Sequence, residues 1–111
     1  MKNQAKSIKI LEELIRYFTF HQVNDLMIHF DSSKESLNIS ISGATDDPPN
    51  DMAQLEELLK AGRRPEFEEY YWGLLGSSST RNELSLLGAL VDDGTVAFDD
   101  GVLKVTITRH E

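Results

Sequence analysis

The stretch PEFEEYYWGLLGSSSTRNELSLLGALVDDGTVAFDDGVLKVTITR, Pro65–Arg109, decides the fold. Its first part predicts a helix over Pro65–Gly76, because proline pre-sets the first helical turn and glycine favours a helix end. A polar loop follows. Thr80 and Glu83 have the spacing of a capping box, so the next helix is expected to begin at Thr80.

The end of this stretch alternates apolar and polar residues, which is typical of a half-buried strand pair. We expect a hairpin of Thr95–Phe98 and Val102–Thr108 around the turn Asp99–Gly101. One side of its second strand is expected to face the core through Leu103, Val105 and Ile107.

The first half of the chain carries the same two kinds of signal. Apolar residues recur at helical spacing near the start, and two short runs then alternate as strands do. A Pro-Pro pair ends the second run, because proline cannot continue a strand ladder. The predicted elements are a helix at Asn3–His21, strands at Asp25–Asp31 and Ser36–Ser42, a loop at Gly43–Pro49, and a helix from Asn50 or Asp51 to Gly62.

Together these elements predict one α+β domain over residues 1–111. We expect a two-layer sandwich, with about four helices on one face of a mixed sheet built from two hairpins. The predicted core consists of Ile8, Leu11, Ile15, Phe18, Leu26, Ile28, Phe30, Leu37, Ile39, Leu84, Leu87, Val105 and Ile107.

Composition limits the possible functions. The chain has no cysteine, which excludes disulfides and thiolate chemistry and fits a cytoplasmic protein. Its net charge of −8 would repel nucleic acid phosphates. No apolar run reaches the roughly 20 residues that a membrane span needs. We therefore expect neither nucleic acid nor membrane as a partner.

Five short segments follow one another in the order of the motifs of the ATP-binding domain of histidine kinases, gyrase and heat-shock chaperones. The chain therefore resembles this GHKL family, which implies its fold. The segments are Glu13–Tyr17 for the first conserved helix, Gly43–Asp47 for the Asp-x-Gly-x-Gly box, Phe67–Tyr71 for the Phe-Glu-x-Phe-Tyr segment, Arg81–Leu84 for the Gly-Leu-Gly-Leu opening, and Gly94–Val96 before the last hairpin.

The resemblance implies a nucleotide site whose chemistry is degraded. Tyr17 stands where the family has a magnesium-binding Asn, and Gly43 stands where it has the adenine-reading Asp. Arg81 replaces a glycine that lets the backbone approach phosphate, while Asp46 falls within the glycine box. We therefore expect no cofactor and no enzyme activity. The alternative is a small ATP-binding kinase or ATPase of the anti-sigma-factor type, which would use ATP and magnesium.

Glu13 would be the general base under that alternative. The simpler interpretation is a solvated carboxylate beside Arg16 on the helix face. Asp46, Asp47 and Asp51 could similarly bind a divalent cation, but an acidic loop at a helix start explains them better. The three histidines are far apart in sequence and do not indicate a metal site.

A protein-interaction module with a regulatory role is the function that these observations favour. Aromatic residues are enriched at interface hot spots, and Tyr70 and Trp72 lie in the densest aromatic segment of the chain. Asp46 and Asp47 in the acidic loop are the other expected contacts for a protein partner. A homodimer is a further possibility.

Overall fold

The structure is a computed structural model that describes residues 3–33, 35–62 and 87–110. Residues 87–90 are helical. The described residues thus contain three helical segments, against about four predicted; the segment predicted as a helix over Pro65–Gly76 lies outside them. The named elements are α1 (Asn3–Phe20), β1 (Leu26–Ser32), β2 (Ser36–Ala44), α2 (Met52–Lys60), β3 (Asp93–Asp99) and β4 (Val102–His110).

The four strands form one sheet in the order β1-β2-β4-β3, and every neighbouring pair is antiparallel. The prediction of two hairpins is confirmed, whereas the prediction of a mixed sheet is wrong. β2 and β3 do run in the same direction, but β4 lies between them. β2 and β4 therefore form the centre of the sheet, with Ile39 opposite Ile107 and Ile41 opposite Val105.

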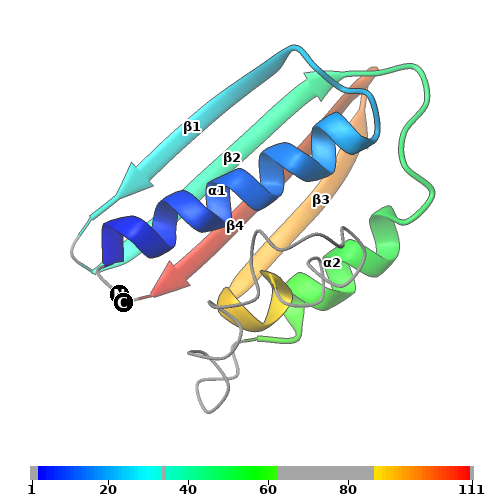
Figure 1. Ribbon diagram of the computed structural model, residues 1–111. Helices are drawn as coiled ribbons and strands as arrows, with labels where there is room; N and C mark the ends of the chain where they lie inside the picture. The colour runs from blue at the N-terminus through cyan, green and yellow to red at the C-terminus, as the bar shows by residue number, and fades with distance from the viewer. Residues whose placement is uncertain (1–2, 34, 63–86, 111) are drawn as a thin grey trace.

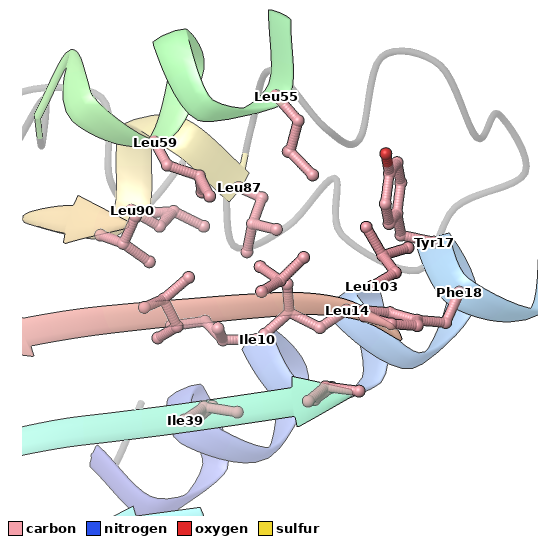
Figure 2. Close-up of a cluster of buried hydrophobic side chains, with 14 of the residues drawn as sticks. Ile10, Leu14, Tyr17, Phe18, Ile39, Leu55, Leu59, Leu87, Leu90 and Leu103 are labelled. Atoms are coloured by element: carbon pink, nitrogen blue, oxygen red, sulfur yellow. The ribbon is translucent and has the colours of Figure 1, made fainter. Parts of the chain in front are cut away.

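The helices cover one face of this sheet, which gives the predicted two-layer α+β arrangement. Figure 1 shows α1 lying over the middle of the sheet and α2 running beside β3. The apolar cluster of Figure 2 lies between the helices and the sheet. α1 contributes Leu14 and Phe18 to it, and α2 contributes Leu55 and Leu59. None of the described helices is long and apolar enough to cross a membrane.

The buried face of α1 differs from the predicted one. Ile10, Leu14 and Phe18 are fully buried, while Leu11 and Ile15 are only partly buried. Ile8, predicted in the core, is 51% exposed. The stripe was predicted from apolar residues alone, but the buried face also includes Ser7, Glu13 and Tyr17 and is thus rotated away from Ile8.

β1 is also less buried than its apolar pattern predicts. Ile28 and Phe30 are 43% and 39% exposed, so their assignment to the core is wrong. β1 is an outer strand with a single neighbour, whereas α1 contacts β2. Leu26 is partly buried, and Leu84 lies outside the described residues. The other predicted core residues are fully buried: Phe18, Leu37, Ile39, Leu87, Val105 and Ile107.

The predicted turn signals agree with the backbone. Asp100 and Gly101 both have positive φ, 52° and 77°, which is the conformation of a two-residue hairpin turn matched to the strand twist. Gly62, predicted to follow α2, has a φ of 93°. Each signal is local, which is why the sequence pattern predicts it.

Candidate functional site

Two segments meet where α1 ends and α2 begins, and they bring together several of the predicted site residues. The Tyr17 hydroxyl donates a hydrogen bond to Oδ1 of Asp51, at 2.8 Å. Nε2 of His21 lies 3.8 Å from the same oxygen. The Tyr17 and His21 rings are edge to face with their centroids 4.8 Å apart. These three side chains join the last turn of α1 to the start of α2.

The protonation of Tyr17 follows from this environment. Burial raises the pKa of the phenol, because ionisation would place a charge away from water, and the hydrogen bond and negative charge of Asp51 raise the pKa further. Tyr17 therefore remains a neutral hydrogen-bond donor. A protonated phenol already donating to a carboxylate is poorly suited to the magnesium-binding role that the resemblance gives this position.

Asp51 occupies the predicted N-cap position of α2, but its side chain caps no backbone N–H of the helix. The carboxylate accepts the Tyr17 hydroxyl instead. Only the backbone carbonyl of Asp51 takes part in the helix start, by accepting the N–H of Leu55. Asp51 thus connects two helices where the sequence predicted a local cap.

The acidic loop before α2 is held at its first residues. The N–H of Thr45 donates to the carbonyl of Gly101 at 2.9 Å, which ties the loop to the β3–β4 turn. The N–H of Asp47 donates to Oγ1 of Thr45 at 3.1 Å. Asp46 and Asp47 are exposed, and their role as contacts for a protein partner stays a prediction.

A surface depression of about 390 Å³ lies between this loop and the end of α1. Phe20 lines it and is 61% exposed. Asp47, which is also exposed, lines the same depression. We call this feature the Phe20–Asp47 depression; it is lined by Phe20, His21, Gln22, Asp47, Pro48, Pro49 and Asn50.

The structure agrees with the predicted neighbour of Glu13 but not with its predicted exposure. The expected neighbour is confirmed, because Oε1 of Glu13 lies 3.2 Å from Nη1 of Arg16. The expected exposure is wrong, since Glu13 is 5% exposed whereas Arg16 is 48% exposed. Glu13 falls on the buried side of α1, and it does not line the Phe20–Asp47 depression.

Gly43 is a packing position in this structure. A Cβ at this residue would lie 2.5 Å from Cγ1 of Val23 and 3.1 Å from Cδ2 of Leu26. The aspartate that the resembled family has here would therefore require Val23 to move. The glycine allows the loop after α1 to approach β2 closely.

The remaining predicted residues are not brought into this site. Tyr70, Trp72 and Arg81 lie outside the described residues, so their roles stay predictions. Within the described ranges, no three His, Asp or Glu side chains are grouped so that they could hold a metal ion. His29 is exposed on β1, as its position on the wetter face predicted.

Two residues, one at this depression and one at the far end of β4, were missed from the sequence. Phe20 lies two residues beyond the apolar stripe, where only its size and exposed position distinguish it. Arg109 is 2% exposed, and its Nη1 donates to the carbonyl of Leu90 at 2.6 Å. The alternation Leu103, Val105, Ile107 would have placed Arg109 inward too, had it been extended by one step.

Comparison of the chain with protein-family models, with curated proteins and with solved structures found no match, so its function must be inferred from the residues described above.

Proposed function

We propose that this protein is a non-catalytic interaction module that binds a basic side chain of a partner protein in the Phe20–Asp47 depression. The observation that carries this proposal is that an exposed aromatic ring, Phe20, and an exposed carboxylate, Asp47, line one depression of about 390 Å³. An arginine can stack on an aromatic face and also form paired hydrogen bonds to a carboxylate. No acidic or purely apolar side chain uses both surfaces.

The geometry of the depression supports this proposal because both sides are held before a partner arrives. Phe20 packs edge to face on His21, with centroids 5.1 Å apart. Asp47 follows a loop start that is fixed to the β3–β4 turn, and two prolines come directly after it. A preorganised site loses less conformational freedom on binding, so more of the contact energy appears as affinity.

The charge of the chain supports a basic partner as well. The net charge is −8, and Asp46 lies next to Asp47 on the same exposed loop. Such a field speeds the encounter with a positively charged surface and repels acidic ones. We thus propose that the protein exerts its regulatory role by binding a basic segment of another protein.

Two observations weigh against the ATP-binding alternative. The Tyr17 hydroxyl is engaged by Asp51, and the Gly43 position has no room for a Cβ beside Val23. These are the positions to which the resemblance assigns magnesium binding and adenine recognition. The support for an interaction module therefore comes from the exposed depression and from the unsuitability of Tyr17 and Gly43 for nucleotide binding.

The experiment is a binding titration with fluorescent peptides of one sequence that carry Arg, Lys, Gln or Glu at a single position. We expect the Arg peptide to bind best. Phe20→Ala and Asp47→Asn should each weaken that binding by about three- to thirtyfold, a range that corresponds to roughly 0.7–2 kcal/mol. Asp100→Asn is the matched control, since it removes an equally exposed carboxylate from the β3–β4 turn.

Equal binding of the Arg and Gln peptides would show that the depression does not select a cation. An equal loss with Asp100→Asn would reduce the effect to net charge alone. Either result would remove this proposal.

A further inference from the structure

The two outer strands of the sheet differ in what covers their free edges. At β3, Oε2 of Glu56 accepts the N–H of Val96 at 2.8 Å, so α2 satisfies an edge donor directly. Nζ of Lys60 adds an ion pair with Oδ1 of Asp93 at 3.4 Å. Gly94 permits this seating, because a Cβ there would lie 2.7 Å from Leu59. The β3 edge is therefore blocked by α2.

The edge of β1 has no such cover in the described part of the chain. Within residues 3–33, 35–62 and 87–110, the backbone groups of β1 hydrogen-bond only to β2. The one side-chain bond to this strand joins the hydroxyls of Ser7 and Ser32 at its far end, at 3.1 Å. Alternate N–H and C=O groups of an outer strand point away from the sheet, so β1 presents an unpaired row of donors and acceptors.

β1 has few of the features by which natural proteins protect an open edge, and Asp31 is its one carboxylate. Its sequence, LMIHFDS, contains no proline and no lysine, and its register with β2 is continuous over all seven residues without a bulge. Met27 is 78% exposed. A long, regular and apolar edge strand of this kind is a template for pairing with another strand.

Apolar side chains extend from the strand toward α1. Ile28 and Phe30 lie on the helix side of the sheet, opposite the buried Ile41 and Ile39, yet both remain partly exposed. Ile8 of α1 lines the same surface depression, of about 460 Å³, as Phe30. The apolar layer between helices and sheet thus continues to β1, which is an outer strand of the sheet (Figure 1).

The outer face of the sheet is a different kind of surface. On the central strands β2 and β4 it includes small polar side chains that satisfy one another: the hydroxyls of Ser40 and Thr106 lie 3.3 Å apart, and Thr108 donates to Oδ1 of Asn38 at 3.3 Å. The exposed Met27 lies on the β1 part of this face. Among the surfaces that the structure describes, exposed apolar area is concentrated on β1, where Met27, Ile28 and Phe30 are 78%, 43% and 39% exposed; on the other outer strand Phe98 is 38% exposed.

We propose that a second copy of this chain covers the β1 edge, with the two β1 strands antiparallel about a twofold axis at His29. The two sheets then form one continuous sheet of eight strands, twice the four of one chain. This surface is separate from the Phe20–Asp47 depression, and the proposal does not depend on it.

The register follows from strand length and charge. Because β1 runs from Leu26 to Ser32, only an axis at its midpoint, His29, pairs all seven residues. Ile28 of each copy then faces Phe30 of the other on the helix side, which closes the apolar layer across the axis. An axis at Ile28 would place Asp25 opposite Asp31 twice, and like charges in that arrangement are destabilising.

The axis at His29 also places the Asp31 carboxylate near a hydrogen-bond donor on the outer face, because an imidazole ring carries an N–H. Asp31 of each copy lies opposite Met27 of the other and diagonal to His29 of the second copy, within reach of a side-chain contact. Each chain uses its own β1 edge for this contact. Once the two edges have paired, no β1 edge is left free, so the assembly closes at two chains.

The first experiment measures mass by light scattering on the full chain across a dilution series. We expect a reversible equilibrium between 12.5 kDa and twice that mass. His29→Asp should weaken self-association by more than about tenfold, because two carboxylates would face each other across the axis. Thr95→Asp is the matched control, since Thr95 is exposed on the blocked outer strand, and it should leave the equilibrium unchanged.

The register is tested by mixing charge variants. His29→Asp and His29→Lys should each be monomeric alone, and an equimolar mixture should recover the dimer. Because the chain has no cysteine, His29→Cys should also form a disulfide-linked dimer, whereas Met27→Cys should not, since Met27 faces Asp31.

A chain that stays monomeric at the highest concentration overturns the proposal. A dimer that His29→Asp leaves intact places the interface elsewhere, and cross-linking through Met27→Cys but not His29→Cys rejects the register.

Discussion

The Tyr17 hydroxyl and the Asp51 carboxylate lie 2.8 Å apart, although 34 positions separate them in the sequence. This bond makes the end of α1 and the start of α2 one structural unit. Phe20 and Asp47, the two sides of the proposed binding depression, each lie a few residues from one of its partners. The bond therefore links the two segments that carry them.

Tyr17→Phe should change how stability depends on pH. The folded-state pKa of Tyr17 is raised above the unfolded value, which is about 10. Its contribution is therefore complete below pH 10 and is lost as pH rises further, because the unfolded chain releases a proton that the folded chain retains. Wild type should lose about 1.4 kcal/mol by pH 11 that Tyr17→Phe does not lose. Urea denaturation of both at pH 8 and pH 11 measures this; parallel losses would contradict it.

Arg109 should be important for stability despite its charge. Its Nη1 donates to the carbonyl of Leu90, at the end of the helical residues 87–90, and the side chain is 2% exposed. Arg109→Met leaves that buried carbonyl without this donor, which should cost about 1–3 kcal/mol. Lys104→Met is the control, because Lys104 is exposed on the same strand and should change stability by less than about 0.5 kcal/mol. Similar denaturation midpoints for the two variants would argue against this role.

Leu87 should be among the most sensitive core positions. It is fully buried among side chains from both helices and the sheet, as Figure 2 shows. Leu87→Ala removes buried methyl groups and leaves a cavity, so the free energy of unfolding should fall by about 2–5 kcal/mol. Val102→Ala, at a position that is 39% exposed, is the milder comparison. Thermal and urea denaturation give both values, and a loss below about 1 kcal/mol for Leu87→Ala would contradict its place in the core.

Magnesium-ATP should not bind with useful affinity. The Tyr17 hydroxyl is already used by Asp51, and Gly43 stands where the resembled family reads adenine. Isothermal titration with magnesium-ATP and magnesium-ADP should show no saturable heat, and neither ligand should raise the melting temperature. Micromolar binding of either would reject the interaction module in favour of the kinase or ATPase alternative. The resemblance also places Glu83 at a family glycine, so Tyr17→Asn with Glu83→Gly would restore two family residues. This double variant should still fail to bind, because Gly43 is unchanged.

Local patterns predicted the strands, the hairpin turn at Asp100-Gly101 and the end of α2 at Gly62. These features depend on a few adjacent residues and on backbone conformations that glycine favours. The sheet order was beyond such patterns, because nothing in either hairpin indicates that β4 inserts between β2 and β3. The exposure of Ile28 and Phe30 follows from that order.

The candidate site was predicted to the same extent. The exposed acidic loop followed from its composition, and Asp46 and Asp47 lie where a partner can reach them. The contact of Tyr17 with Asp51 depends on how α1 and α2 approach each other, which helical periodicity does not report. The burial of Glu13 was missed for the same reason, since its helix has more than one buried side.

The central place of β4 also has a kinetic consequence. Its pairing with β2 brings together residues as distant as Ser40 and Thr106, 66 positions apart. Closing so long a loop costs conformational entropy before the central contacts can offset it, and proteins rich in such contacts fold slowly. Each hairpin can form early by itself, but the hydrophobic layer between them closes only once the last strand has docked. The rate at which this protein reaches its native state is thus set by the meeting of its two hairpins.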